Sequence, residues 1–457
     1  MAYQTINTFT NQLIKEYHSH TQEDIDAALE KAHALYQSDW AKGEIDQRLP
    51  VLHKLADLLD QRTEELAKIA SEEMGKLIAQ SRGEVQLCAQ IARYYADNAK
   101  QFLAPVKYPS DLGEAWVEHH PIGVLMAVEP WNFPYYQLIR VLAPNLAAGN
   151  PVLVKHASIV PHCAEAFEHL VREAGAPDGA YTNLFISSDQ VSAIIEDDRV
   201  QGVALTGSEK AGAAVAAQAA KNLKKSTLEL GGNDVFVVLD DCDMEKAVKV
   251  GVQARLQNAG QVCTAAKRFI VHEAVADTFL EKFRAAFEAV KLGDPLDEST
   301  TLGPLSSADA LKTLTEQVNA AVKKGAKVLT GGKPVDHKGN FFEPTILTGI
   351  TRDNPAWFEE FFGPVAQVYV VKDDEEVVKL ANDSHYGLGG AIFSQNIERA
   401  KRLASRIETG MVYINSLTDT APELPFGGVK RSGFGRELSD LGIKEFVNHK
   451  LVVISNA

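Results

Sequence analysis

Short apolar segments alternate with helical segments through most of the chain. Residues 124–128, 151–155 and 202–205 have the length and the continuous apolar character of buried strands. Between them lie segments of helical character, such as residues 160–174 and the alanine-rich stretch 209–221. Parallel strands need a crossover connection, so this alternation predicts a parallel sheet with helices on both faces. The predicted fold class is therefore α/β.

The same alternation resumes after Gly231 and Gly232. Apolar segments at 235–239, 365–370 and 411–414 predict further strands. A chain of 457 residues is also too long for a single core. We therefore expect two successive α/β halves that are divided near the glycine pair. The first hundred residues are predicted to be helical.

One cysteine and one glutamate lie in segments that suggest chemistry. Cys263 lies in Gln257–Thr264 (QNAGQVCT), among small and amide side chains that leave a thiol accessible. Glu229 lies in Leu228–Asp234 (LELGGND), where an acid in an apolar stretch precedes two glycines. Apolar surroundings raise the pKa of a carboxyl toward neutrality, as a general base requires. The pair indicates covalent catalysis by a sulfur nucleophile with a separate base. A buried structural cysteine and a glutamate that ends a strand remain the alternative.

These two segments and four others resemble the aldehyde dehydrogenase superfamily over essentially the whole chain. The other four are Glu129–Pro134 (EPWNFP), Leu205–Ser208 (LTGS), Glu359–Pro364 (EEFFGP) and Leu424–Gly433 (LPFGGVKRSG). Six separated motifs in the same order are far more specific than a single glycine pattern. Within the superfamily the chain is most similar to the succinate-semialdehyde dehydrogenases, particularly the shorter bacterial ones.

The resemblance implies an aldehyde dehydrogenase-like fold, with two successive α/β domains, parallel-rich sheets and a small oligomerisation arm. Residues 1–103 and 121–230 would form the cofactor-binding domain, and residues 231–438 the catalytic domain. Residues 104–120 and 439–457 would form the arm. The chain is therefore expected to be a homodimer or a homotetramer.

The resemblance also implies a role for each catalytic residue. The thiolate of Cys263 would attack the aldehyde carbon, and Glu229 would activate the water that releases the acid. The Asn132 side-chain amide and the backbone N–H of Cys263 would hold the oxyanion, and each donor is worth roughly 3 kcal/mol of barrier. A turn-forming asparagine is the alternative for Asn132. The glutamate favours hydrolysis over transfer to coenzyme A, because acylating relatives typically lack it.

A dinucleotide site is expected after a strand, at the start of a helix. The pattern G-x-G-x-x-G is absent, but Gly207 and Ser208 would place free amides at a helix N-terminus, which suits a pyrophosphate. A turn with a close helix–strand contact is the alternative. The resemblance assigns the diphosphate to Ser208, the adenosine ribose to Lys155 and the nicotinamide ribose to Glu360. The residues that it places at the cofactor are Trp131, Lys155, Ser158, Gly207, Ser208, Leu230, Glu360 and Phe362.

Two of these positions also have physical interpretations. The stem of Lys155 can pack while its ammonium reaches solvent. Glu360 stands beside two phenylalanines and would be expensive to bury without a partner. In the family, the residue three positions after the lysine faces the adenosine ribose, and a glutamate there repels a 2′-phosphate. Ser158 is small and neutral, so we expect the cofactor to be NADP or NAD, with a preference for NADP.

Arg140 interrupts an apolar run and is the clue to the substrate. Tyr136 lies one helical turn before it, so both side chains share a face. An arginine fork beside an aromatic ring suits a carboxylate held by two hydrogen bonds. An internal ion pair is the alternative. The resemblance places Arg140, Tyr136 and Thr420 at the far carboxylate of succinate semialdehyde, although those relatives usually have Trp and Ser at the last two positions.

The predicted function is thus NAD(P)-dependent oxidation of an aldehyde, with succinate semialdehyde as the first candidate substrate. A phosphorylated three-carbon aldehyde and a catalytically silent structural relative remain alternatives. The net charge of −15 argues against a nucleic-acid binder. No run of about 18 apolar residues predicts a membrane span, and neither a signal peptide nor a metal-ligand spacing is evident. We expect a cytoplasmic protein that acts on a small molecule without a metal.

Overall fold

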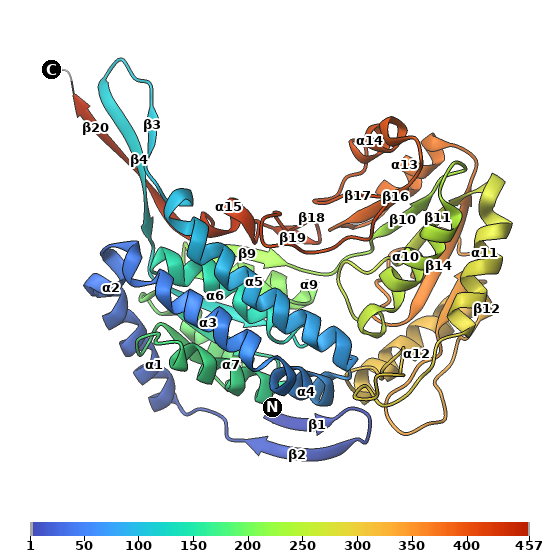
Figure 1. Ribbon diagram of the computed structural model, residues 1–457, viewed down its shortest axis with the longest axis horizontal. Coiled ribbons are helices and arrows are strands. Elements are labelled where there is room, and N and C mark those ends of the chain that lie inside the picture. The colour runs from blue at the N-terminus through green and yellow to red at the C-terminus, as the bar shows by residue number, and fades with distance from the viewer. Residues whose placement is uncertain (1–2, 456–457) are drawn as a thin grey trace.

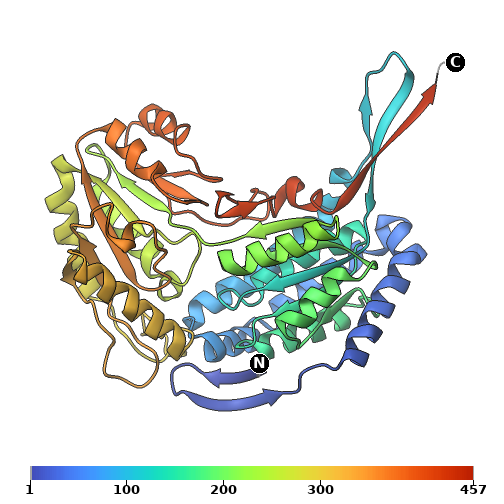
Figure 2. The same ribbon diagram turned by 180° about the vertical axis from the view of Figure 1, so that it is seen from behind.

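The computed structural model describes residues 3–455. These residues form two lobes, each built around its own sheet, and a three-stranded arm that extends from the first lobe (Figures 1 and 2). Helices cover the sheets in both lobes (Figure 1). The predicted α/β class with two successive halves is confirmed.

The first lobe contains a six-stranded sheet in the order β19-β9-β8-β5-β6-β7. Its strands are β5 (Val124–Glu129), β6 (Val152–His156), β7 (Tyr181–Asn183), β8 (Val200–Thr206), β9 (Lys225–Glu229) and β19 (Gly433–Phe434). The strands β5 to β9 run parallel, as the alternation predicts. β19 comes from far along the chain and pairs antiparallel with β9.

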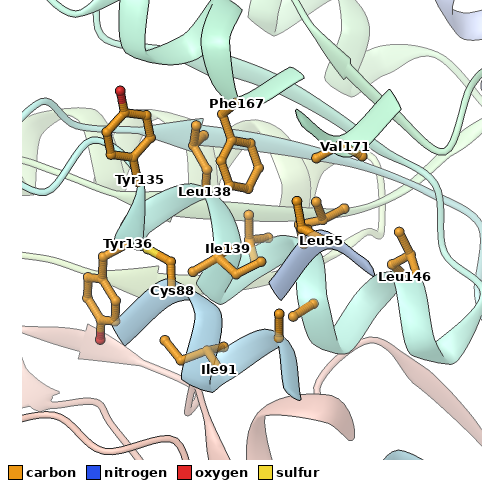
Figure 3. Close-up of a cluster of buried hydrophobic side chains, with 14 of the residues drawn as sticks. Leu55, Cys88, Ile91, Tyr135, Tyr136, Leu138, Ile139, Leu146, Phe167 and Val171 are labelled. Carbon is orange, nitrogen blue, oxygen red and sulfur yellow. The ribbon is translucent and has the colours of Figure 1, made fainter. Parts of the chain in front are cut away.

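Helices cover both faces of this sheet. They are α1 (Gln22–Gln37), α2 (Asp39–Lys42), α3 (Leu49–Gln61), α4 (Thr63–Met74), α5 (Ile78–Phe102), α6 (Tyr136–Ala148), α7 (Pro161–Glu173), α8 (Ser188–Glu196) and α9 (Glu209–Lys221), with a 3₁₀ turn at Ile45–Gln47. On one face α3, α5, α6 and α7 bury Leu55, Ile91, Leu138 and Phe167 in one cluster (Figure 3). Burial of each such side chain contributes about 1.5–3 kcal/mol. This packing fixes α6, the helix that carries Arg140.

The second lobe contains a seven-stranded sheet in the order β12-β13-β14-β11-β10-β16-β17. Its strands are β10 (Val235–Val238), β11 (Arg268–His272), β12 (Lys327–Thr330), β13 (Thr345–Thr348), β14 (Val365–Val371), β16 (Gly390–Phe393) and β17 (Tyr413–Ile414). All neighbours are parallel except β12 and β13. The helices are α10 (Met244–Leu256), α11 (Glu273–Glu288), α12 (Ala308–Lys323), α13 (Asp374–Asn382) and α14 (Ile397–Ala404), with 3₁₀ turns at Gln257–Gly260 and Pro355–Trp357. No helix within residues 3–455 is long and apolar enough to cross a membrane.

The arm consists of β3 (Val106–Tyr108), β4 (Gly113–Pro121) and β20 (Val447–Ser455), which follows α15 (Ser439–Ile443). β20 pairs antiparallel with β4 along its whole length. The strands extend beyond the body of the molecule (Figure 2), and the arm exposes Leu112, Leu451 and Ile454. The pairing of the tail with the 105–120 hairpin agrees with the expectation from the resemblance.

The amino-terminal segment differs from the prediction. β1 (Tyr3–Asn7) and β2 (Gln12–Tyr17) form an antiparallel hairpin where helices were expected. Nearly all residues of β2 are exposed, so the strand has no burial pattern that a sequence can reveal. β1 is held by contacts distant in sequence: the Tyr3 hydroxyl donates to the carbonyl of Ile186 at 2.7 Å.

The lobes meet end to end. β9 ends at Glu229 and β10 begins at Val235, so the glycine pair 231–232 connects them. The chain returns through a small sheet of β15 (Tyr386–Gly387) and β18 (Val429–Lys430) and then through β19. The Asn132 side chain, which follows β5, donates to the carbonyl of Gln261 ahead of β11 at 3.1 Å. The carboxyl ends of the first sheet thus face the amino ends of the second.

Candidate active site

Cys263 lies on a loop of unusual backbone conformation, directly before β11. Asn258, Ala259 and Gly260 all have φ between 50° and 78°, a region that disfavours non-glycine residues and stores strain. Side-chain hydrogen bonds hold the loop in place. The Asn258 amide donates to the Asn132 carbonyl at 2.9 Å, and the Arg255 guanidinium donates to the Gly260 carbonyl at 2.6 Å. The position of the thiol is therefore fixed by a small network that spans both lobes.

Two opposing influences act on the pKa of the Cys263 thiol. Burial raises the pKa of the thiol to about 12, and nearby Lys267 and Arg140 act in the opposite direction. Since the thiolate is the nucleophile, positive charge around the loop favours reactivity. The other described cysteines have less suitable surroundings. Cys88 and Cys163 are buried. Burial and then Asp241 raise the pKa of Cys242, and the charged neighbours that act on it are acids, whereas cations act on Cys263.

Glu229 is the last residue of β9 and is buried. Neither carboxyl oxygen has a hydrogen-bond partner among residues 3–455. Burial, and then the neighbouring Glu437, raise the pKa of Glu229 well above its ordinary value, while Arg140 opposes this effect. Its charge also acts on the Cys263 thiol. The raised pKa of this acid was predicted from the sequence, and an unpartnered carboxyl beside a thiol has the properties of a general base.

Asn132 is buried beside the nucleophile loop. Its Nδ2 donates one hydrogen bond to the Gln261 carbonyl, and its Oδ1 accepts a long one, 3.5 Å, from Gln137. An amide nitrogen carries two protons, so one proton is available to an oxyanion at Cys263. The geometry is compatible with the predicted role and gives Asn132 a structural bond as well.

A cavity of about 310 Å³ lies between the lobes and opens onto Cys263. Its lining includes Phe133, Tyr136, Arg140, Thr420 and Phe426. The predicted nucleophile and all three predicted substrate-binding residues therefore share one cavity. Tyr136 and Tyr135 point in opposite directions from α6, with the Tyr136 hydroxyl directed away from the core cluster (Figure 3).

Arg140 is bound on several sides at the wall of this cavity. Its Nη2 donates to Gln137 at 2.6 Å and to Thr206 at 2.9 Å, and its Nη1 donates to the Tyr136 hydroxyl at 3.1 Å. Its Nε forms an ion pair with Glu437. Four of the five N–H groups of a guanidinium are thus engaged. The expectation of two hydrogen bonds to a substrate carboxylate is wrong for this geometry, because one Nη1 proton remains. The internal ion pair that was the alternative is present.

Glu437 is a residue of this site that the sequence does not reveal. A buried arginine in an apolar run signals that a partner exists, but not which acid supplies it. Thr420 completes the group through a hydrogen bond with Tyr136.

The predicted diphosphate segment lies at the start of α9. Ser208 caps this helix by accepting a hydrogen bond from the Ala211 N–H at 3.3 Å, and the first turn keeps the free amides of a helix N-terminus. Gly207 does not add to them, because its N–H donates to the Glu229 carbonyl at 2.9 Å. The expectation of a free Gly207 amide is therefore wrong. Leu230 packs against Gly212 of the same helix.

The predicted adenosine end lies at the carboxyl end of β6. Lys155 is buried, and its ammonium donates to the His156 carbonyl at 3.0 Å and lies 5.5 Å from the centre of the Tyr3 ring. Burial lowers the pKa of Lys155, so the solvent-reaching alternative does not describe it. Ser158 is half-buried, and its carbonyl accepts a hydrogen bond from the Gln4 N–H at 3.2 Å. The hairpin strand β1 thus borders this end, which the sequence did not indicate.

The predicted nicotinamide end lies beside the nucleophile loop. The Trp131 and Phe362 rings meet edge to face at 5.7 Å. Glu360 accepts hydrogen bonds from Lys267 at 3.0 Å and from the Gly232 N–H at 3.1 Å. The partner that its burial requires is therefore present within the protein, so the burial of Glu360 does not by itself require a ligand there. Lys267 was missed because it lies in an ordinary strand-start segment.

Within residues 3–455 no group of three or more His, Cys, Asp or Glu side chains is arranged to hold a metal ion. The donor set of the cavity is instead a thiol, carboxyls, amides and a guanidinium. These groups suit covalent chemistry on a carbonyl compound and the binding of an anion.

Comparison with known proteins agrees with this geometry. The chain matches the model of the aldehyde dehydrogenase family over residues 1–452. It is 49% identical over 448 residues to the succinate-semialdehyde dehydrogenase (NADP+) of Deinococcus radiodurans, which covers 98% of this chain and 94% of that protein. The solved structure of succinic semialdehyde dehydrogenase from Streptococcus pyogenes in complex with NADP+ has a TM-score of 0.98 and 51% identity, with 100% of both chains covered.

The family model spans nearly the whole chain, and relatives about half identical to this chain belong to the same family. The chain belongs to the aldehyde dehydrogenase family.

Proposed function

We propose that this protein oxidises succinate semialdehyde to succinate with NADP. The observation that carries the proposal is that Cys263 and Arg140 line the same cavity. A substrate with an aldehyde at one end and a carboxylate at the other can reach both groups at once. The Deinococcus radiodurans and Streptococcus pyogenes relatives carry this activity in their names.

The residues of the site support a sequence of defined steps. The Cys263 thiolate bonds to the aldehyde carbon, and the Asn132 amide and the Cys263 N–H stabilise the oxyanion. Bound NADP supplies the acceptor for the hydride that leaves this carbon, and a thioester on Cys263 results. Glu229 then takes a proton from water, whose oxygen adds to the thioester carbon and displaces the thiolate. The products are succinate and NADPH, two protons are released, and the Cys263 thiolate is regenerated.

The charge balance of the cavity disfavours the phosphorylated aldehyde. Two cationic side chains line it, Lys76 and Arg140, and each forms an ion pair with a buried acid, Glu84 and Glu437 respectively. A phosphate dianion would need positive charge that these pairs already neutralise. A single carboxylate needs only the remaining Arg140 proton and the hydroxyls of Tyr136 and Thr420.

The substrate assignment is tested by removing the guanidinium. Arg140→Met is expected to raise the KM for succinate semialdehyde roughly thirtyfold and to leave butanal almost unchanged. Loss of one charge-assisted hydrogen bond costs about 2 kcal/mol, and butanal lacks the carboxylate. NADPH absorbance at varied aldehyde concentration measures both constants.

This variant leaves Glu437 buried without its partner, which is strongly destabilising by itself. The double variant Arg140→Met/Glu437→Gln removes that unpaired charge and serves as the matched control. Equal losses on both aldehydes in the folded double variant would assign Arg140 to structure alone.

The cofactor assignment is tested at Ser158. Ser158→Glu is expected to raise the KM for NADP at least tenfold, about 1.4 kcal/mol, and to spare NAD. A carboxylate at this position repels a 2′-phosphate, whereas it can accept hydrogen bonds from a ribose diol. Ser158→Gln, of similar size without the charge, separates repulsion from bulk. A wild-type enzyme that reduces NAD but not NADP would contradict the assignment.

We also propose that the protein is a cytoplasmic homo-oligomer, a dimer or a tetramer, joined through the arm. The exposed apolar side chains of β20 and of the β3–β4 turn support this role, since apolar surface of this kind favours association. Light scattering on the eluting protein measures the mass, and a monomer at micromolar concentration would contradict the proposal.

A further inference from the structure

Lys267 lies beneath the nucleophile loop and has no part in the chemistry described above. Its side chain is fully buried. The ammonium donates to the Val262 carbonyl at 2.8 Å, to the Cys263 carbonyl at 2.5 Å and to the Glu360 carboxylate at 3.0 Å. An ammonium has three protons, so each one has an acceptor. Two of these acceptors belong to the nucleophile loop.

The contacts of Lys267 and Glu360 link the three loops that precede β10, β11 and β14. Lys267, Gly232 and Glu360 precede β11, β10 and β14, which are neighbours in the second sheet. Glu360 accepts from Lys267 and from the Gly232 N–H. Gly232 in turn lies against the nucleophile: a Cβ at this position would lie 2.4 Å from the Cys263 carbonyl oxygen. Glu360 is therefore linked through Lys267 and Gly232 to the loop that carries the thiol.

The charge of Lys267 acts on the Cys263 thiol together with the charges of several other side chains. The charged groups that act on Cys263 are Lys267, Arg140, Glu360 and Glu229. Asp234 is a neighbouring buried acid, and the charged groups that act on it include Lys267, Glu360 and Arg268. Burial is the larger influence on the thiol and raises its pKa, and among the charges Lys267 lowers that pKa most. Arg255 is held at the same loop through the Gly260 carbonyl.

We propose that Lys267 is a positioning residue that ties the carboxylate of Glu360 to the backbone of Cys263 and provides the positive charge that makes this thiol reactive. The inference rests on the proposed function and on the role that the resemblance gives to Glu360, contact with the nicotinamide ribose. Lys267 would thus place the ribose and the nucleophile in one rigid unit, so that the cofactor and the thiol are set at a fixed separation before the aldehyde enters.

The test measures thiol reactivity without aldehyde and without turnover. The rate of Cys263 alkylation by iodoacetamide is followed against pH in the wild type and in Lys267→Met, with Cys263→Ala as the background. Burial raises the pKa of Asp234 to about 7, so rates are compared from pH 8 upward, where that acid is ionised. Lys267→Met is expected to be alkylated roughly tenfold more slowly at pH 8.5, which corresponds to a thiol pKa higher by about one unit.

Two further variants separate charge from packing. Lys267→Gln keeps a hydrogen-bond donor without the charge and is expected to be slow, whereas Lys267→Arg keeps the charge and is expected to recover most of the rate. Arg268→Met is the matched control, because Arg268 is also a buried cation that binds backbone carbonyls, those of Asn233, Leu380 and Ala381, and it is the next residue of the chain. Its loss should lower the melting temperature and leave the alkylation profile unchanged.

The contact between Lys267 and Glu360 is tested through the KM for NADP. Lys267→Met is expected to raise the KM for NADP severalfold, since Glu360 loses the contact that holds it. An unchanged alkylation profile in Lys267→Met, or an equal shift in Arg268→Met, would overturn the role of Lys267. Failure of the proposed function would look different: the wild type would be alkylated normally at Cys263 yet would not reduce NADP with succinate semialdehyde.

Discussion

Cys263→Ala is expected to lower NADPH formation from succinate semialdehyde by more than roughly four orders of magnitude. The reaction requires a covalent bond between the protein and the aldehyde carbon, and the thiol supplies it. The neighbouring Thr264 also lines the cavity, but an unactivated hydroxyl is a far weaker nucleophile than a thiol. Steady-state absorbance at high enzyme concentration measures the residual rate.

The variant should otherwise resemble the wild type. The side chains of Arg255, Asn258 and Lys267 hold the nucleophile loop by donating hydrogen bonds to backbone carbonyls. None of these bonds uses the sulfur, so the loop conformation and the affinity for NADP are expected to persist. Cys242→Ala is the matched control, since Cys242 is a half-buried cysteine of the second lobe that does not line the cavity. Its activity should equal that of the wild type. Residual activity above about one per cent in Cys263→Ala would refute covalent catalysis by this thiol.

Glu229→Gln is expected to produce about one equivalent of NADPH per active site and then to stall. Acylation requires the thiol, whereas release of the acid requires a base, and loss of a general base lowers the rate of its step roughly 10²–10⁴-fold. Glutamine matches the buried carboxyl in size. Rapid-mixing absorbance resolves the burst, and mass spectrometry of the stalled enzyme should show a succinyl group on Cys263.

Glu129→Gln is the control for this experiment. Glu129 is also a buried carboxyl at the end of a parallel strand, and burial raises its pKa well above the ordinary value. Unlike Glu229, it is not among the charged groups that act on the Cys263 thiol, and its variant is expected to turn over repeatedly. Ordinary steady-state turnover in Glu229→Gln would exclude Glu229 as the base.

The pH dependence follows from the same residue. A base acts in its ionised form, and burial raises the pKa of Glu229. The deacylation rate should therefore fall as the pH falls below this raised value and should rise toward alkaline pH. Glu229→Gln should lose that limb of the profile.

The sequence was sufficient for the parts of the fold that have local signals. β5 and β10 are continuous apolar runs, and the helices between strands have helical periodicity, so both parallel sheets were predictable. β2 and β19 were not. β2 is exposed along its length and β19 has two residues, so neither has a burial pattern, and each is a strand only because of its partner.

The site divides in the same way. The motifs around Cys263, Glu229 and Asn132 contain residue types that indicate catalysis. In the structure these three residues lie where the two lobes meet. The pairings of Arg140 with Glu437 and of Glu360 with Lys267 could not be predicted. A buried charge indicates that a counter-charge exists, but the choice among many acids and bases depends on tertiary contacts that no local pattern encodes.

The pairing of β19 with β9 has a consequence for the order in which the chain acquires its structure during synthesis. β9 ends at Glu229, the proposed general base, and within residues 3–455 its outer edge pairs only with Gly433 and Phe434 of β19. Most of the first lobe leaves the ribosome long before these residues, so that edge stays open until translation is almost complete. During synthesis the outer edge of β9 is therefore unpaired, and the protein inactive, until the residues of β19 have been translated.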